Sequence, residues 1–257
     1  MSPAALPETG CPPEQATLWL WTGHAAYLGL SLQLNAHSGS VQCLAVGIDA
    51  PFTLRAHELG ERVVRSALIS PRVVHQVVAH GERMLFCYID PSSSRAEHCR
   101  DRMLEQGKHI SLAHQAEAAI IHLAQEPDPD PSRLMDLVSD AAHEPVDARI
   151  ATAIATLRAH PGRNLSATEL AAEAHLSTSR FLHLFSAQAG TSFRRYRLWS
   201  RMLHVGASVS KGHDLTTASA DAGFATPSHF SDAFHAMFGL TAAQLLTVGA
   251  RIDVLDQ

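Results

Sequence analysis

Two segments of the chain share an arrangement of side chains that could bind a ligand. Ser177, Phe181, Phe185 and Gly190 recur 49 residues later as Thr226, Phe230, Phe234 and Gly239. In each segment a hydroxyl side chain can cap a helix, and the two phenylalanines lie four positions apart on one helical face. The phenylalanines should pack inward, which leaves the intervening side chains facing solvent or a groove. The repeat therefore predicts two matched helices, each with a free polar face.

The exposed positions of the first helix are Ser179, Arg180, Leu182 and His183. Residues near the N-terminal end of such a helix reach base edges when the helix enters the major groove of DNA. Arg180 can donate two hydrogen bonds to guanine O6 and N7, which is worth ~1–3 kcal/mol of discrimination. A phosphate contact is the alternative for Arg180, and Leu182 either presses on a thymine methyl group or belongs to the core.

The second helix offers Ser228, His229 and Asp232 at its exposed positions, and these side chains are short or acidic. A carboxylate cannot bind phosphate or a guanine edge, although it can accept a hydrogen bond from cytosine N4. The second helix should therefore contribute less to binding than the first. Between the two helices, Arg194 and Arg195 are candidate phosphate contacts, whereas Arg201 is expected to have an Asp or Glu partner within the fold.

The elements that position these side chains have clear start and stop signals. Ser166 and Glu169 form a capping box, Ser177 can cap the next helix, and Thr226 precedes Pro227 at a first helical position. Two helices joined by a tight turn form a helix-turn-helix unit. We expect two such units, at about 166–189 and 216–238, joined by a helix from about 193 to 209. The competing interpretation is a duplicated helical bundle without a ligand.

The N-terminal half has a different pattern. From Leu18 to about Asp90, short apolar runs alternate with turn residues such as Ser38-Gly39 and Ser70-Pro71, which favours a small β-barrel or sandwich. Helical spacing follows over 95–105 and 112–124, and three alternating prolines precede a further short helix. We expect a flexible lead-in at 1–17, a barrel at 18–92, a helical appendage and linker at 93–146, and a helical domain at 147–248.

Charge divides the chain in the same way. The net charge is -5, but residues from Asp147 onward carry ten Lys or Arg against eight Asp or Glu, so the excess acid lies in the front half. No apolar run approaches the ~20 residues that a membrane span needs, and the N-terminus lacks the pattern of a secretory signal. The four cysteines have no metal-knuckle spacing. These observations favour the cytoplasm and exclude a membrane partner and structural zinc.

The helical part resembles the AraC/XylS family of bacterial transcription regulators. The motifs that carry the resemblance are Leu170-Ala171, Leu176-Ser177, Phe193-Arg194-Arg195-Tyr196, Ala222-Gly223-Phe224, Ser228-His229-Phe230 and Phe238-Gly239-Leu240. The resemblance implies an all-α domain of two helix-turn-helix units whose recognition helices enter adjacent major-groove segments on one side of the DNA. Its implied partners are double-stranded DNA, RNA polymerase, a small-molecule effector and a second copy of the chain.

The chain departs from the family pattern at three places. His175 stands in the first inter-helix turn, where the family usually has Gly, so a residue with Cβ must adopt the backbone angles of that turn. Asp232 stands where a basic residue is common. Ala218-Ser219 replaces the usual Ile-Ala pair, which makes a smaller core contact.

The N-terminal half resembles the cupin-like sensor barrel that precedes this domain in many family members, so the expected class is α+β and multidomain. Metal-binding cupins carry a His-x-His pair with a later Glu and a further His, and here only His37 and His75 lie near those places. We therefore expect no metal and no cofactor. Effector-binding candidates on inward strand faces are Gln42, Arg55, His57 and His75.

Two other functions compete with a DNA-binding regulator. One is an interaction module with weakened DNA binding, which the small positive charge of the helical part and Asp232 favour. The other is a cupin-type metalloenzyme, which needs a metal tetrad or a nucleophile with its base. The sequence offers neither, so we expect no enzymatic activity and assign no catalytic residue.

Overall fold

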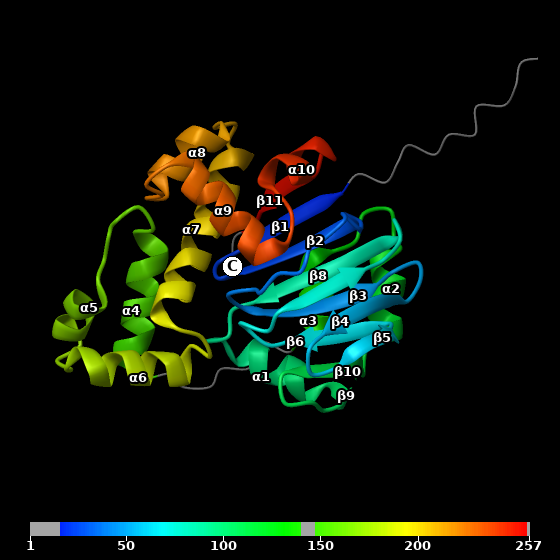
Figure 1. Ribbon diagram of the computed structural model, residues 1–257, viewed down its shortest axis with the longest axis horizontal. Coiled ribbons are helices and arrows are strands. Elements are labelled where there is room, and N and C mark those ends of the chain that lie inside the picture. The colour runs from blue at the N-terminus through cyan, green and yellow to red at the C-terminus, as the bar shows by residue number, and fades with distance from the viewer. Residues whose placement is uncertain (1–15, 140–146, 256–257) are drawn as a thin grey trace, which may run out of the picture.

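The computed structural model describes residues 16–139 and 147–255, and it places a β-rich region beside a helical region (Figure 1). The larger sheet has the order β11-β1-β2-β8-β3-β6-β10-β9. Its strands are β11 (Arg251–Val254), β1 (Thr17–Trp21), β2 (His24–Leu30), β8 (Arg83–Ile89), β3 (Gln42–Gly47), β6 (Ser66–Ile69), β10 (Ile110–His114) and β9 (Met103–Glu105). The smaller sheet has the order β5-β4-β7, formed by β5 (Gly60–Val64), β4 (Phe52–Ala56) and β7 (His75–Val78).

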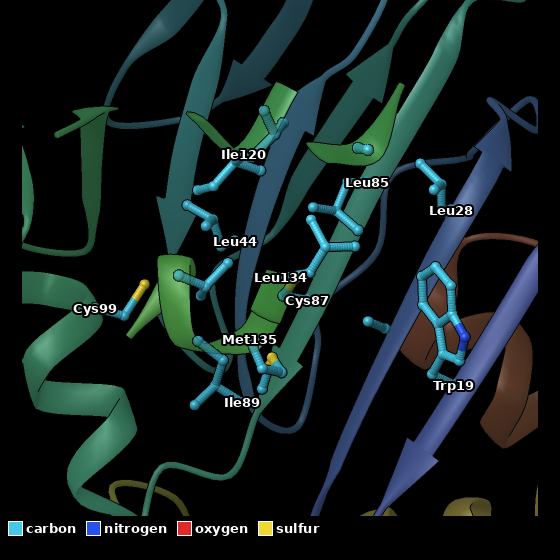
Figure 2. Packing of buried hydrophobic residues seen from close by; sticks show 14 of the residues in the cluster. Trp19, Leu28, Leu44, Leu85, Cys87, Ile89, Cys99, Ile120, Leu134 and Met135 are labelled. Carbon is cyan, nitrogen blue, oxygen red and sulfur yellow. The ribbon is translucent and has the colours of Figure 1, made fainter. Parts of the chain in front are cut away.

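The larger sheet is buried on both faces at its centre, which explains the continuous apolar runs of β3 and β8. One face packs against the smaller sheet, where Phe52, Leu54 and Val77 point inward. The other face is covered by α1 (Ser94–Asp101), α2 (Glu117–Ala124) and α3 (Pro131–Val138). Figure 2 shows Leu44 and Leu85 of the sheet meeting Ile120 and Leu134 of these helices. Each such side chain contributes about 1.5–3 kcal/mol by leaving water.

Two expectations for this half are corrected. The sheets form no closed barrel, although the region is as rich in strands as predicted. The segment after Pro91 is also not wholly helical, because β9 and β10 lie at 103–105 and 110–114. Ile110–Leu112 pair with Ile69–Ala67 of β6, and this long-range pairing outweighs a local helical pattern. Of the expected lead-in at 1–17, residues 1–15 lie outside the described residues, and Thr17 already begins β1. The part of the expected linker at 140–146 also lies outside the described residues.

The C-terminal region consists of helices, as predicted. They are α4 (Ala148–Ala159), α5 (Ala167–Glu173), α6 (Thr178–Gln188), α7 (Phe193–Ser210), α8 (Leu215–Asp221), α9 (Pro227–Phe238) and α10 (Ala242–Thr247). The capping box of Ser166 and Glu169 is formed, and Phe181 and Phe185 are fully buried beside Phe193 and Tyr196. In the parts of the chain described here, no helix combines the length and apolarity of a membrane span.

The helical region is docked on the larger sheet. Strand β11, beyond the last helix, pairs in parallel with β1 at the edge of that sheet (Figure 1). The Trp199 indole Nε1 of α7 donates a hydrogen bond to the Gly23 carbonyl at 2.9 Å. Leu20, Ala25 and Val41 of the β region share a buried apolar cluster with α7, α8 and α9.

Candidate nucleic-acid interface

Helix α6 presents the predicted polar face of the first helix-turn-helix unit. Ser179, Arg180 and His183 are exposed, and Leu182 is 37% exposed, so Leu182 does not belong to the core. The Ser177 hydroxyl caps the helix by accepting from the Arg180 backbone N–H. The cap fixes the start of α6 and so directs the exposed side chains of its first turns outward.

Helix α9 carries the corresponding face of the second unit. Ser228, His229 and Asp232 are exposed, and Thr226 caps the helix by accepting from the His229 N–H. The apolar face of α9 packs against the larger sheet, where the Phe238 ring meets the Tyr88 ring edge-on at 5.4 Å. The N-terminal half of α9 is therefore open, while its C-terminal half is attached to the β region.

The turns inside the two units have the same backbone character. His175 has a φ of 53°, and Gly223, which takes its place in the second unit, has a φ of 80°. His175 thus adopts the left-handed angles that the sequence required of it. In α8, Ala218 and Ser219 are both buried, and the Ser219 hydroxyl donates to the Thr216 carbonyl. This bond satisfies the buried Ser219 hydroxyl, a polar group that the Ala usual at this position would lack.

The arginines of α7 serve different purposes. Arg194 is exposed, so it remains a candidate for phosphate contact. Arg195 instead donates from Nη1 to the Ser38 and Gly39 carbonyls of the β region, at 3.2 and 3.0 Å. Arg201 is buried, but its partners are the Pro161 carbonyl and the Phe224 ring, and the expectation of an acidic partner is wrong.

The sequence did not predict that a loop of the β region holds the connecting helix α7 and the second helix-turn-helix unit. We call residues 35–39 the clamp loop. Besides accepting from Arg195, it donates from the Ser38 N–H to the Ala236 carbonyl and from the Asn35 N–H to the Gly239 carbonyl. The polar residues of the clamp loop have no periodic pattern that would predict its role. The one residue in the sequence that indicates this contact is Gly239, where a Cβ would lie 2.5 Å from the Asn35 carbonyl oxygen.

A buried charged group forms a second junction between the regions. The Asp90 carboxylate, at the end of β8, accepts from Arg158 Nη2 of α4 and from the Tyr196 hydroxyl of α7. Burial opposes its charge, but Arg158 and His24 hold the pKa of Asp90 below its usual value. The Asp90 N–H donates to His24 Nδ1 at 3.0 Å, and burial lowers the pKa of His24 to about 4.

The four effector-binding candidates do not lie together. Arg55, His57 and His75 line a shallow groove at the end of β4 and β7, where Arg55 pairs with Glu61 at 2.7 Å. Arg55 and His57 are exposed and do not face the interior. Gln42 lies elsewhere and donates from Nε2 to the Ala96 carbonyl of α1. Within the described ranges, no group of three or more His, Cys, Asp or Glu is arranged to hold a metal ion.

The apolar cavity between sheet and helices was not foreseen. It measures about 110 Å³. Its walls come from β1, β2, β8 and β11 of the larger sheet on one side and from α7, α9 and α10 on the other. Leu20, Tyr88, Met202, Phe234 and Leu246 are among the lining residues. None of the described residues that line it is charged.

Comparison with known proteins supports the assignment of the helical region. Residues 170–247 match the model of a helix-turn-helix domain family. A search of curated proteins gives no match. With the motifs and the paired units described above, the match identifies an AraC-type helix-turn-helix domain, and the chain is a DNA-binding transcription regulator.

Solved structures share the fold over most of the chain. ToxT from Vibrio cholerae is similar, with a TM-score of 0.56 and 13% identity over 88% of this chain and 98% of that one. An apo ToxT variant from strain SCE256 gives a TM-score of 0.61 and 11% identity, with the same coverage. Wild-type ToxT with a bound unsaturated fatty acid gives a TM-score of 0.55 and 12% identity, over 91% of this chain and 94% of that one.

Proposed function

We propose that this regulator binds duplex DNA by placing α6 and α9 in adjacent major-groove segments, with α6 supplying most of the base recognition. The exposed Arg180 on a capped helix start is the observation that carries the proposal. Its guanidinium can bond guanine O6 and N7 together, with Ser179 and His183 beside it. On α9, the short or acidic side chains of Ser228, His229 and Asp232 contribute less to binding. Arg194 supplies a phosphate contact, and Arg195 becomes available to DNA only if it leaves the clamp loop.

Binding to duplexes selected by the wild-type chain tests this proposal. Affinity should fall steeply with salt, because neutralised phosphates release counterions. Arg180→Ala should cost about 1–3 kcal/mol and relax the preference at one base position. Arg149→Ala is a matched control, because Arg149 is also an exposed arginine but lies on α4, where it pairs with Asp147 just before the helix. An equal loss for every sequence would reassign Arg180 to phosphate, and no selectable duplex would refute the proposed function.

The apolar cavity favours a second part of the function, which is response to an apolar effector. Sites for small molecules commonly measure about 300–1,000 Å³, and this cavity measures about 110 Å³. A larger ligand must therefore part the sheet from α7 and α9. Binding would then change the docking of the second helix-turn-helix unit. ToxT, which shares the fold, has been solved with an unsaturated fatty acid.

Oleate is a suitable probe for this cavity. We expect saturable binding, a change in DNA affinity and quenching or shift of the Trp199 fluorescence, because Trp199 lines the cavity. Leu246→Trp, which adds volume to the wall, should weaken oleate binding about tenfold or more while the fold persists. Equal binding by this variant would place the oleate elsewhere. If bound oleate leaves the DNA affinity unchanged, the proposed regulatory role of the cavity is wrong.

A further inference from the structure

The loop that leads into the first helix-turn-helix unit touches the second unit, at a point that does not involve the polar faces of α6 and α9. The loop between α4 and α5 meets the turn between α8 and α9 through two glycines. A Cβ built on Gly162 would lie 2.3 Å from the Asp221 carbonyl oxygen, and one built on Gly223 would lie 2.8 Å from the Gly162 carbonyl oxygen. The backbones are therefore in direct contact, and neither position has room for a side chain.

Arg201 of α7 bridges this contact. Its Nε donates to the Pro161 carbonyl at 3.2 Å on the side of the first unit. On the other side, its guanidinium carbon lies 5.9 Å from the centre of the Phe224 ring, in the turn of the second unit. The Phe224 ring in turn contacts the His229 and Phe230 rings at 5.5 and 5.3 Å, at the start of α9.

The surroundings of Arg201 argue against a role in stability alone. Arg201 is 7% exposed, and in the described part of the chain no carboxylate pairs with it. A buried guanidinium without an anion carries a desolvation cost that an apolar side chain of similar size would avoid. The charged group adds directional contacts, because its Nε–H donates to a carbonyl and its guanidinium carbon lies over an aromatic ring.

We propose that Arg201 is a positioning residue that sets the orientation of α9 relative to α6, and thereby the spacing of the two DNA segments that the chain can bind together. The clamp loop holds the C-terminal end of α9. Arg201 acts at the N-terminal end, where Ser228 and His229 lie. The proposal builds on the proposed function, but the orientation it describes is a property of the protein without DNA.

Spin labels on both helices measure that orientation directly. Ser186 of α6 and Ser228 of α9 are exposed, so Ser186→Cys and Ser228→Cys in a Cys11→Ser background provide a label pair. We expect one narrow distance distribution in the full chain and a broader or shifted one with Arg201→Met, which keeps the apolar stem. Arg197→Met is the matched control, because Arg197 donates to Leu165 and Asn164 of the first unit's loop. The control should leave the distribution narrow.

DNA spacing gives the second readout. A selected duplex with one base pair inserted between the two contacted segments should bind wild-type protein about tenfold more weakly, and Arg201→Met should reduce that ratio to about threefold. Phe224→Leu tests the same bridge from the second unit if Arg201→Met fails to fold. Unchanged distances and an unchanged spacing ratio in a folded variant would overturn the proposal. If wild-type protein selects no duplex, the proposed function fails, while the label distances still decide the role of Arg201.

Discussion

Asp232 lies on the exposed face of α9 at the place that His183 takes on α6. A carboxylate beside phosphates is unfavourable unless a cytosine amino group or a neighbouring Arg compensates it. We expect Asp232→Arg to tighten non-specific DNA binding and to steepen its salt dependence, and Asp232→Ala to be neutral or mildly favourable. Titrations at several salt concentrations measure both effects. If a folded Asp232→Ala variant no longer bound a defined operator, Asp232 would instead recognise cytosine, and this prediction would be wrong.

His175 stores strain in the turn of the first unit. A non-glycine residue in the left-handed region costs roughly 1–2 kcal/mol, whereas glycine there loses more entropy on folding, worth about 0.4–1 kcal/mol. We therefore expect His175→Gly to raise the free energy of unfolding by about 0.5–1 kcal/mol, and the β-branched His175→Val to lower it by about 1–2 kcal/mol. Denaturant titration measures both. A destabilised His175→Gly variant would mean that the imidazole makes a stabilising contact.

At the scale of elements, the sequence predicted those helices and strands whose formation depends on interactions between residues close in the chain. The starts of α5, α6 and α9 were predictable, because Ser166, Ser177 and Thr226 cap amides within three positions. The open sheet and the strands β9 and β10 were not, because their formation depends on partners far along the chain. The exposed face of each recognition helix followed from the spacing of its phenylalanines. The partners of Arg195 and Arg201 did not, because backbone carbonyls leave no sequence pattern.

The junction of β2, β8, α4 and α7 should weaken in acid. His24 is neutral when buried, with a pKa lowered to about 4 from 6.5, so its contribution is complete above pH 6.5 and is lost as the pH falls towards 4. We expect protonation of His24 to lower the free energy of unfolding by on the order of 3 kcal/mol. Asp90, whose pKa is lowered, loses its contribution only at still lower pH.

The variant His24→Asn separates this effect from other histidines, including His75, whose pKa burial also lowers to about 4. Asn supplies an oxygen that can accept the Asp90 N–H but does not titrate. Unfolding measured from pH 7 to 4 should show a shallower fall for the variant than for wild type. Identical slopes would show that His24 does not control acid stability.

At the scale of the molecule, the helical region is not a freely tethered module. Trp199 and Met202 of α7, together with Phe238 of α9, pack on the sheet, and β11 completes its edge. We expect a fragment of residues 147–257 to keep its helices, because their caps lie within it. Its uncovered apolar face should lower its thermal stability and promote self-association. Sedimentation and thermal unfolding test this, and a fragment as monomeric and stable as the full chain would contradict it.

Docking at the clamp loop, at Asp90 and around the apolar cavity ties α4, α7 and the second helix-turn-helix unit to the β region. This arrangement explains how a ligand bound between sheet and helices could alter DNA binding, since a change there moves the support of α7 and the second unit. The β region at 16–139 has only a small acidic excess, with 13 Asp or Glu against 10 Lys or Arg. The exposed side chains of α6 and of the start of α9 are not part of the docking contacts, so they remain available to DNA.

On the proposed binding mode, α6 and α9 enter two adjacent major-groove segments and α6 supplies most of the base recognition. Hydroxyl-radical footprinting on a duplex selected by the full chain tests it most directly. We predict two protected segments about 10 base pairs apart on one face of the DNA, with Arg180→Ala weakening base preference in only one of them. A single protected segment, or equal loss of preference in both segments with Arg180→Ala, would contradict this account.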